Sequence, residues 1–139
     1  MAASAAVSGF GTTFSYLSTD PSTYTALGEV LNVTSPDKSR ETVDVTHMGS
    51  DNAHHEYIGT LFEAGSVTVV MNYTEAGAAL CETLFAAGTE TFKITYPGSS
   101  TEVFSGIPTG FTNGDLVIDD KVTMTLTIKI TGKSTYTVV

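Results

Sequence analysis

The stretch that decides the fold is KVTMTLTIKIT, residues 121–131, in which apolar and polar side chains alternate without a break. One set of alternate positions is apolar and consists of Val122, Met124, Leu126, Ile128 and Ile130. The other set holds only lysine and threonine. Because successive side chains of a strand point to opposite faces, this pattern predicts a long strand with one buried and one polar face.

The same period of two predicts further strands at Ser66–Tyr73 and Thr89–Tyr96. Weaker strand patterns cover Thr12–Leu17, Tyr24–Val33, Glu41–Thr46 and Glu102–Phe111. Pro108 marks an edge or a bulge in the last of these, since proline cannot donate to a ladder. Turn sequences lie between the strands, namely Asp20-Pro21-Ser22, Ser35-Pro36-Asp37, Pro97-Gly98-Ser99 and Asn113-Gly114-Asp115. The predicted fold is therefore mainly β, an antiparallel β-barrel or sandwich.

One segment, Glu75–Ala87, breaks this pattern and predicts a single flanking helix. It is rich in alanine and places its larger apolar residues on one helical face, at Leu80, Cys81, Leu84 and Phe85. Thr74 is a suitable N-cap, and Gly88 stands where a glycine C-cap is expected. We expect this helix to cover one open side of the sheet.

The region His47–Gly65 lacks clean periodicity and predicts a long loop between strands. A loop of that length in a compact fold is usually functional. Apolar side chains on it would be costly for a monomer, so we expect it to become ordered against a neighbouring subunit. The candidate contact residues are His47, Met48, His54, His55, Tyr57, Ile58, Leu61 and Phe62. The alternative is a loop that folds back on its own barrel.

Length and composition restrict the possible classes of protein. The 139 residues are the size of one domain, 1–139, and 24 of them are threonine, a residue that suits strands. The net charge is −9 with only six lysines and arginines, which excludes a cationic stripe for nucleic-acid backbones. The N-terminal sequence MAASAAVSGFG predicts neither a signal peptide nor insertion into a membrane.

Candidate chemical sites each have a simpler interpretation. A metal site at His47, His54 and His55 with Asp51 or Glu56 fits no zinc spacing, and solvated loop histidines are the alternative. Asp115, Asp119 and Asp120 lack the ligand pattern of a calcium loop and are interpreted as turn carboxylates. The lone cysteine, Cys81, predicts a small buried apolar residue rather than a nucleophile. We therefore predict no enzyme activity and no cofactor.

Three stretches together resemble one family. They are SRETVDVT at 39–46, HEYIGTLFEAGSV at 55–67 and DDKVTMTLTIKITGK at 119–133. In content and order they are similar to the tail tube proteins of lambda-like phages, which have long, non-contractile tails. The resemblance extends from about Gly9 to Lys133.

The resemblance implies a structural virion protein that polymerises as stacked hexameric rings into the tail tube. The implied partners are further copies of the chain, a tape-measure protein in the lumen, and tail terminator and distal tail proteins. DNA would pass through an acidic lumen without specific binding, and assembly would take place in the bacterial host cytoplasm. The 47–65 segment would act as an assembly loop. Residues 1–9 and 134–139 would be arms that are disordered or docked on a neighbour.

Two alternatives remain open from the residues alone. A monomeric β-sandwich binding module would share the strands, although the chain has no tryptophan for a sugar platform. A tube or ring subunit of a type VI or contractile apparatus would share most of the architecture.

Overall fold

The computed structural model describes residues 3–17 and 23–138. The predicted turn Asp20-Pro21-Ser22 lies outside the described residues, as do 1–2 of the N-terminal arm and 139 of the C-terminal tail. Residues 123–131 of the alternating stretch belong to β9 (Thr123–Thr137), an inner strand of the main sheet. It pairs antiparallel with β6 (Ser66–Asn72) on one side and with β8 (Thr101–Asn113) on the other.

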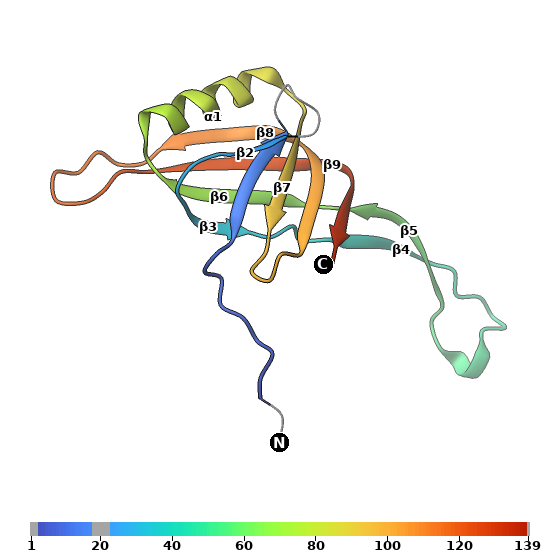
Figure 1. The fold of residues 1–139 in the computed structure, drawn as a ribbon. Helices are drawn as coiled ribbons and strands as arrows, with labels where there is room; N and C mark the ends of the chain where they lie inside the picture. The colour runs from blue at the N-terminus through green and yellow to red at the C-terminus, as the bar shows by residue number, and fades with distance from the viewer. Residues whose placement is uncertain (1–2, 18–22, 139) are drawn as a thin grey trace.

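The main sheet has seven strands in the order β2-β1-β7-β8-β9-β6-β3. Its remaining members are β1 (Thr13–Leu17), β2 (Tyr24–Ala26), β3 (Val30–Thr34) and β7 (Glu90–Thr95). A separate two-stranded sheet consists of β4 (Ser39–Asp44) and β5 (Tyr57–Glu63). The prediction of a mainly antiparallel β fold is confirmed, and the sheet is sandwich-like rather than a closed barrel (Figure 1).

The two edges of the main sheet are close neighbours in the sequence. Residues 24–33, predicted as one strand, form β2 and β3 at opposite edges, separated only by Leu27–Glu29. Leu27 donates its backbone N–H to the Phe14 carbonyl at 3.2 Å, and its side chain lies in the core. So short a connection requires the sheet to roll until its edges approach each other.

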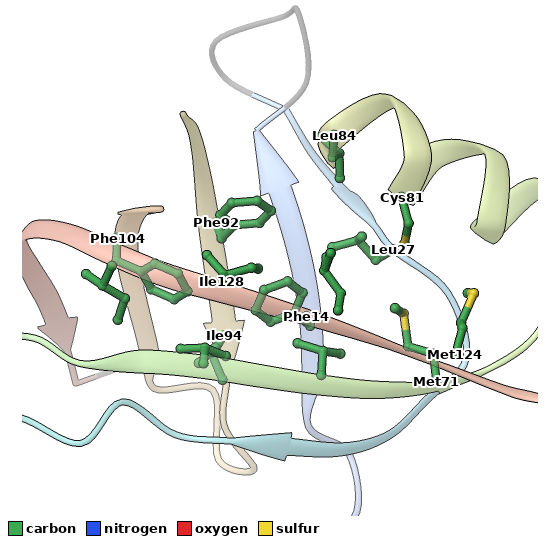
Figure 2. Close-up of a cluster of buried hydrophobic side chains, with 14 residues drawn as sticks. Phe14, Leu27, Met71, Cys81, Leu84, Phe92, Ile94, Phe104, Met124 and Ile128 are labelled. Atoms are coloured by element: carbon green, nitrogen blue, oxygen red, sulfur yellow. The ribbon is translucent and has the colours of Figure 1, made fainter. Parts of the chain in front are cut away.

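The core lies inside this roll (Figure 2). Phe92 stands between Phe14 and Phe104, with ring centroids 5.6 and 5.9 Å away, within the range of favourable aromatic pairs. Met124, Leu126, Ile128 and Ile130 are all buried. The alternation that predicted the long strand therefore identified its buried face correctly.

The predicted helix is α1 (Glu75–Ala87). The Thr74 hydroxyl accepts a hydrogen bond from the Gly77 backbone at 3.0 Å, and Gly88 ends the helix at φ 94°, as the cap residues predicted. Cys81 and Leu84 are buried against the Leu27 side of the core (Figure 2), so the helix covers one open side of the sheet as expected. Phe85, expected on the buried face, is 43% exposed instead.

Two further predicted boundaries were wrong. The expected 47–65 loop contains β5 and a short helix, η1 (Asp51–Ala53), so the irregular connection is shorter than predicted. The expected tail 134–139 continues β9 to Thr137, because the chain bends at Gly132 (φ 79°) and pairs again with β8.

The prediction for Pro108 is confirmed. The β8–β9 register shifts between Pro108 and Gly110, as in a β-bulge. The pairing of β7 with β8 ends at Gly106, so Pro108 follows the part of β8 that is paired on both sides. A residue without an N–H group is therefore accommodated there.

Candidate assembly surfaces

The β4–β5 hairpin, Ser39–Glu63, projects from the rolled sheet (Figure 1). Four of the eight predicted contact residues lie on β5, namely Tyr57, Ile58, Leu61 and Phe62. The other four lie in the connection between the strands, namely His47, Met48, His54 and His55. All eight are exposed, so the structure brings them together on one projecting element.

Both faces of the hairpin carry exposed apolar side chains. The register pairs Tyr57 with Asp44 and Phe62 with Arg40, whereas Ile58 pairs with Val43 on the opposite face. Leu61 and Phe62 are 76% and 74% exposed. A two-stranded hairpin with no core on either face is marginally stable in water, so these side chains are suited to burial against a neighbour.

The connection at the tip of the hairpin, residues 45–56, is organised by its own polar contacts. The Ser50 hydroxyl donates to Glu56 Oε2 at 2.5 Å, and Glu56 Oε2 also lies 3.4 Å from His47 Nε2. Hydrogen bonds from the Thr46 side chain and backbone lower the pKa of Asp44. These contacts give the tip a defined shape.

The root of the hairpin is held to the main sheet by two ion pairs. Lys38 binds Glu102 of β8, and Glu63 binds Lys129 of β9 at 2.5 Å. The hydrogen bond and charge of Lys129 lower the pKa of Glu63. Gly65 follows at φ 84°, with the Asp37 carbonyl so close that an added Cβ would lie 2.5 Å from it. These contacts fix the direction in which the hairpin leaves the sheet.

A second surface was missed in the sequence. Leu116, Val117 and Ile118 lie in the connection between β8 and β9, and Leu116 and Ile118 are 82% and 97% exposed. This connection projects at the end of the fold away from the hairpin (Figure 1). The signal was available as three consecutive apolar residues between Asp115 and the pair Asp119-Asp120.

The residues considered for chemistry are not assembled into a reaction centre. Within 3–17 and 23–138, no three histidine, cysteine or acidic side chains are placed to hold a metal ion together. Cys81 is buried as predicted, and burial, with a smaller effect of Glu82, raises the pKa of its thiol to about 11. A thiol with so high a pKa is a poor nucleophile at neutral pH.

Glu102 is a buried carboxylate whose environment is structural. Burial alone would raise its pKa, but hydrogen bonds from Lys38, Tyr96 and Ser134 and the Lys38 charge outweigh burial and lower it. Every one of these partners belongs to the hairpin root or to the main sheet or its connections. Glu102 therefore joins elements together, and both of its carboxylate oxygens have partners.

The described part of the N-terminal segment before β1 has no regular secondary structure. Residues 3–8 form no helix or strand, and Phe10 beyond them is 93% exposed. Among the described residues, no helix combines the length and apolar character needed to cross a membrane.

Comparison with solved structures gives the same fold in several phage-related particles. The tail of an empty gene transfer agent particle, solved with C6 symmetry, has a TM-score of 0.77 at 15% identity, covering 95% of this chain and 99% of that one. The anti-feeding prophage baseplate has a TM-score of 0.69 at 15% identity, covering 99% of both chains. The SPP1 tail tube has a TM-score of 0.61 at 10% identity, covering 92% of this chain and 77% of that one.

Sequence comparison gives the family. No curated protein matches this chain. The family model described as lambda phage tail tube protein, TTP, matches residues 7–137, which is nearly the whole chain. The family match favours a tube subunit over a monomeric binding module. The chain belongs to the lambda phage tail tube protein family, and it is a structural subunit of a phage tail tube.

Proposed function

We propose that this chain assembles into hexameric rings that stack as a tube, with the β4–β5 hairpin as the main contact between subunits. The observation that carries the proposal is the hairpin itself, which is apolar on both faces and has no core of its own. A monomer would leave this surface in water, whereas a neighbouring copy would bury it. The C6 symmetry of the gene transfer agent tail supports six subunits in each ring.

The outward face of β6 and β9 is the proposed lining of the channel. Its partly exposed side chains include Thr68, Thr125 and Thr127, and its Lys129 is paired with Glu63. Strands β3, β6 and β9 contain no aspartate or glutamate. We therefore propose a lumen wall rich in hydroxyls here, with acidic groups supplied by other elements rather than by this sheet.

A wall of this kind suits a conduit. Uncharged hydroxyls do not release counterions from DNA, so phosphates gain little by binding to them. The same surface can hydrogen-bond to an extended protein, which fits a tape-measure protein occupying the lumen before DNA passes. The proposed role includes no catalysis. Its proposed setting is the virion tail, built in the bacterial cytoplasm and joined there to terminator and distal tail proteins.

Electron microscopy of the purified chain in negative stain tests the proposal. Rings or hollow tubes of uniform width, with sixfold symmetry in end views, are the expected result. A species that sediments as a monomer at every concentration and never polymerises would overturn it. Tubes that bind a separate contractile sheath protein would instead favour the contractile alternative, with which the likeness to the anti-feeding prophage baseplate is compatible.

A further inference from the structure

A groove lies at the root of the hairpin, beside the bend in β9. Its volume is about 660 Å³. Its apolar lining is Phe62, Ala64 and Ile130, and its charged lining is Lys38, Lys133 and Glu63. A groove of this volume can hold several apolar side chains.

The bend in β9 places Lys133 at this groove. Ser105 pairs with Thr131 and Val103 with Thr135, so three residues of β9 oppose one residue of β8. The bulge contains Gly132 at φ 79°, followed by the exposed Lys133. Lys38 is engaged by Glu102 and Glu63 by Lys129, whereas Lys133 has no ion-pair partner among the described residues. The groove therefore offers one unneutralised cation beside an apolar floor.

The loop between β8 and β9, residues 114–122, has the opposite character. Three apolar side chains, Leu116, Val117 and Ile118, are exposed at its end. Asp115, Asp119 and Asp120 flank them, and Lys121 is the one cation of the loop. The loop is closed by its own backbone, since Gly114 donates to Thr123 at 2.6 Å and Asp120 to Val117 at 3.4 Å. The loop 114–122 is thus a projection with an apolar tip and acidic flanks, called the knob below.

The knob and the groove cannot meet within one chain. They lie at opposite ends of the sheet (Figure 1), separated by the straight part of β9 from Thr123 to Ile130. At about 3.3 Å per residue this strand holds them roughly 25 Å apart. A complementary pair at opposite ends joins successive copies head to tail, and such contacts either close into a ring or extend into a filament.

We infer that the 114–122 loop of one copy docks into the groove at the hairpin root of the next copy. Leu116, Val117 and Ile118 enter the apolar part, and Asp119 or Asp120 pairs with Lys133. This inference rests on the proposed self-assembly and names a second contact for it, at the root of the hairpin rather than along its projecting part. It shares Phe62 of β5 with the hairpin contact and adds the bend of β9. It also accounts for the exposure of both surfaces in the single chain.

Charge-reversal substitutions at Asp119 and Lys133, with tube formation as the readout, test the docking. Asp119→Lys and Lys133→Glu should each raise the concentration needed for tube formation about tenfold or more, and the double variant should recover much of the loss. Ile118→Ser should impair assembly, whereas the matched control Ile118→Val should not. Since all three positions are exposed, thermal unfolding of the monomers should be unchanged.

Carbodiimide crosslinking of parent tubes, mapped by mass spectrometry, identifies the occupant. The expected product joins the peptide containing Asp119 and Asp120 to the one containing Lys133. Normal assembly of the single variants, failure of the double variant to recover, or crosslinks of that loop to other lysines alone would each overturn the docking. In those cases tubes of the parent chain still form, so the proposed function stands. If the parent chain forms no tubes, the proposed function itself fails, and the docking fails with it.

Discussion

Lys38 and Glu102 join the root of the β4–β5 hairpin to the centre of the main sheet. Lys38 Nζ lies 2.5 Å from Glu102 Oε2, and the Glu102 side chain is 3% exposed. Tyr96 and Ser134 donate further hydrogen bonds to the same carboxylate at 2.9 and 3.0 Å. A buried carboxylate with this set of donors stabilises the fold only while it is ionised.

Replacing Glu102 with glutamine should lower the free energy of unfolding at pH 7 by about 1.5–3 kcal/mol, the range for a charge-assisted hydrogen bond. The folded pKa of Glu102 is lowered, so its stabilisation is complete above the ordinary value of 4.5 and is lost as pH falls through the folded pKa. Urea unfolding from pH 7 to pH 3 should therefore fall less steeply in Glu102→Gln than in the parent. Parallel curves for the two proteins would contradict this assignment.

Gly65→Ala should destabilise the fold by about 1–3 kcal/mol, because the position combines a positive φ with a backbone carbonyl 2.5 Å from the new Cβ. Hydrogen exchange should show faster opening at the start of β6 and the end of β5. Gly9→Ala is the matched control, since nothing lies within 4 Å of its Cβ. Equal stability of the two variants would show that the hairpin root tolerates displacement.

The Cys81 thiol should resist alkylation by iodoacetamide at pH 8 in the folded protein and react readily in urea. The reason is that the side chain is buried and burial raises its pKa to about 11. Mass spectrometry of the alkylated protein measures the difference. Rapid modification without unfolding would mean that α1 opens from the sheet.

The double variant Tyr57→Ala, Phe62→Ala should remain folded and lose the ability to form tubes of normal length, since both side chains are exposed on one face of the hairpin. Circular dichroism and electron microscopy measure the two effects separately. Phe85→Ala is the control, because it removes a partly exposed phenylalanine from the helix instead. Tubes of normal length from the double variant would remove the hairpin from the assembly contacts.

Sequence reasoning located most of the main sheet because its strands bury one face. Met124, Leu126 and Ile128 alternate with threonine, and this period appears only where one side of a strand meets a core. The β5 strand lacked the signal, since Ile58 and Phe62 occupy opposite faces of a hairpin without a core. Its apolar residues were recognised as contact candidates, but their strand conformation was not.

The second surface was overlooked for a different reason. A run such as Leu116-Val117-Ile118 is ordinarily interpreted as buried, and only the structure shows it outside the sheet. The bend at Gly132 was equally hidden, because a glycine inside a strand pattern suggests a bulge but not the direction of the chain after it. The strand was therefore predicted to end at Thr131, and Ser134 was assigned to a tail although it belongs to β9.

The inner position of β9 has a consequence for the order of folding. β9 follows every other strand of the main sheet in the chain, yet it lies between β8 and β6. Until the ribosome has released it, the nascent polypeptide holds two half-sheets, β2-β1-β7-β8 and β6-β3, each with an open edge. Such edges are templates for aggregation, so the nascent chain is exposed to aggregation until Thr123–Thr137 has been translated and paired. A truncation before β9 would leave unjoined fragments rather than a smaller version of the sheet.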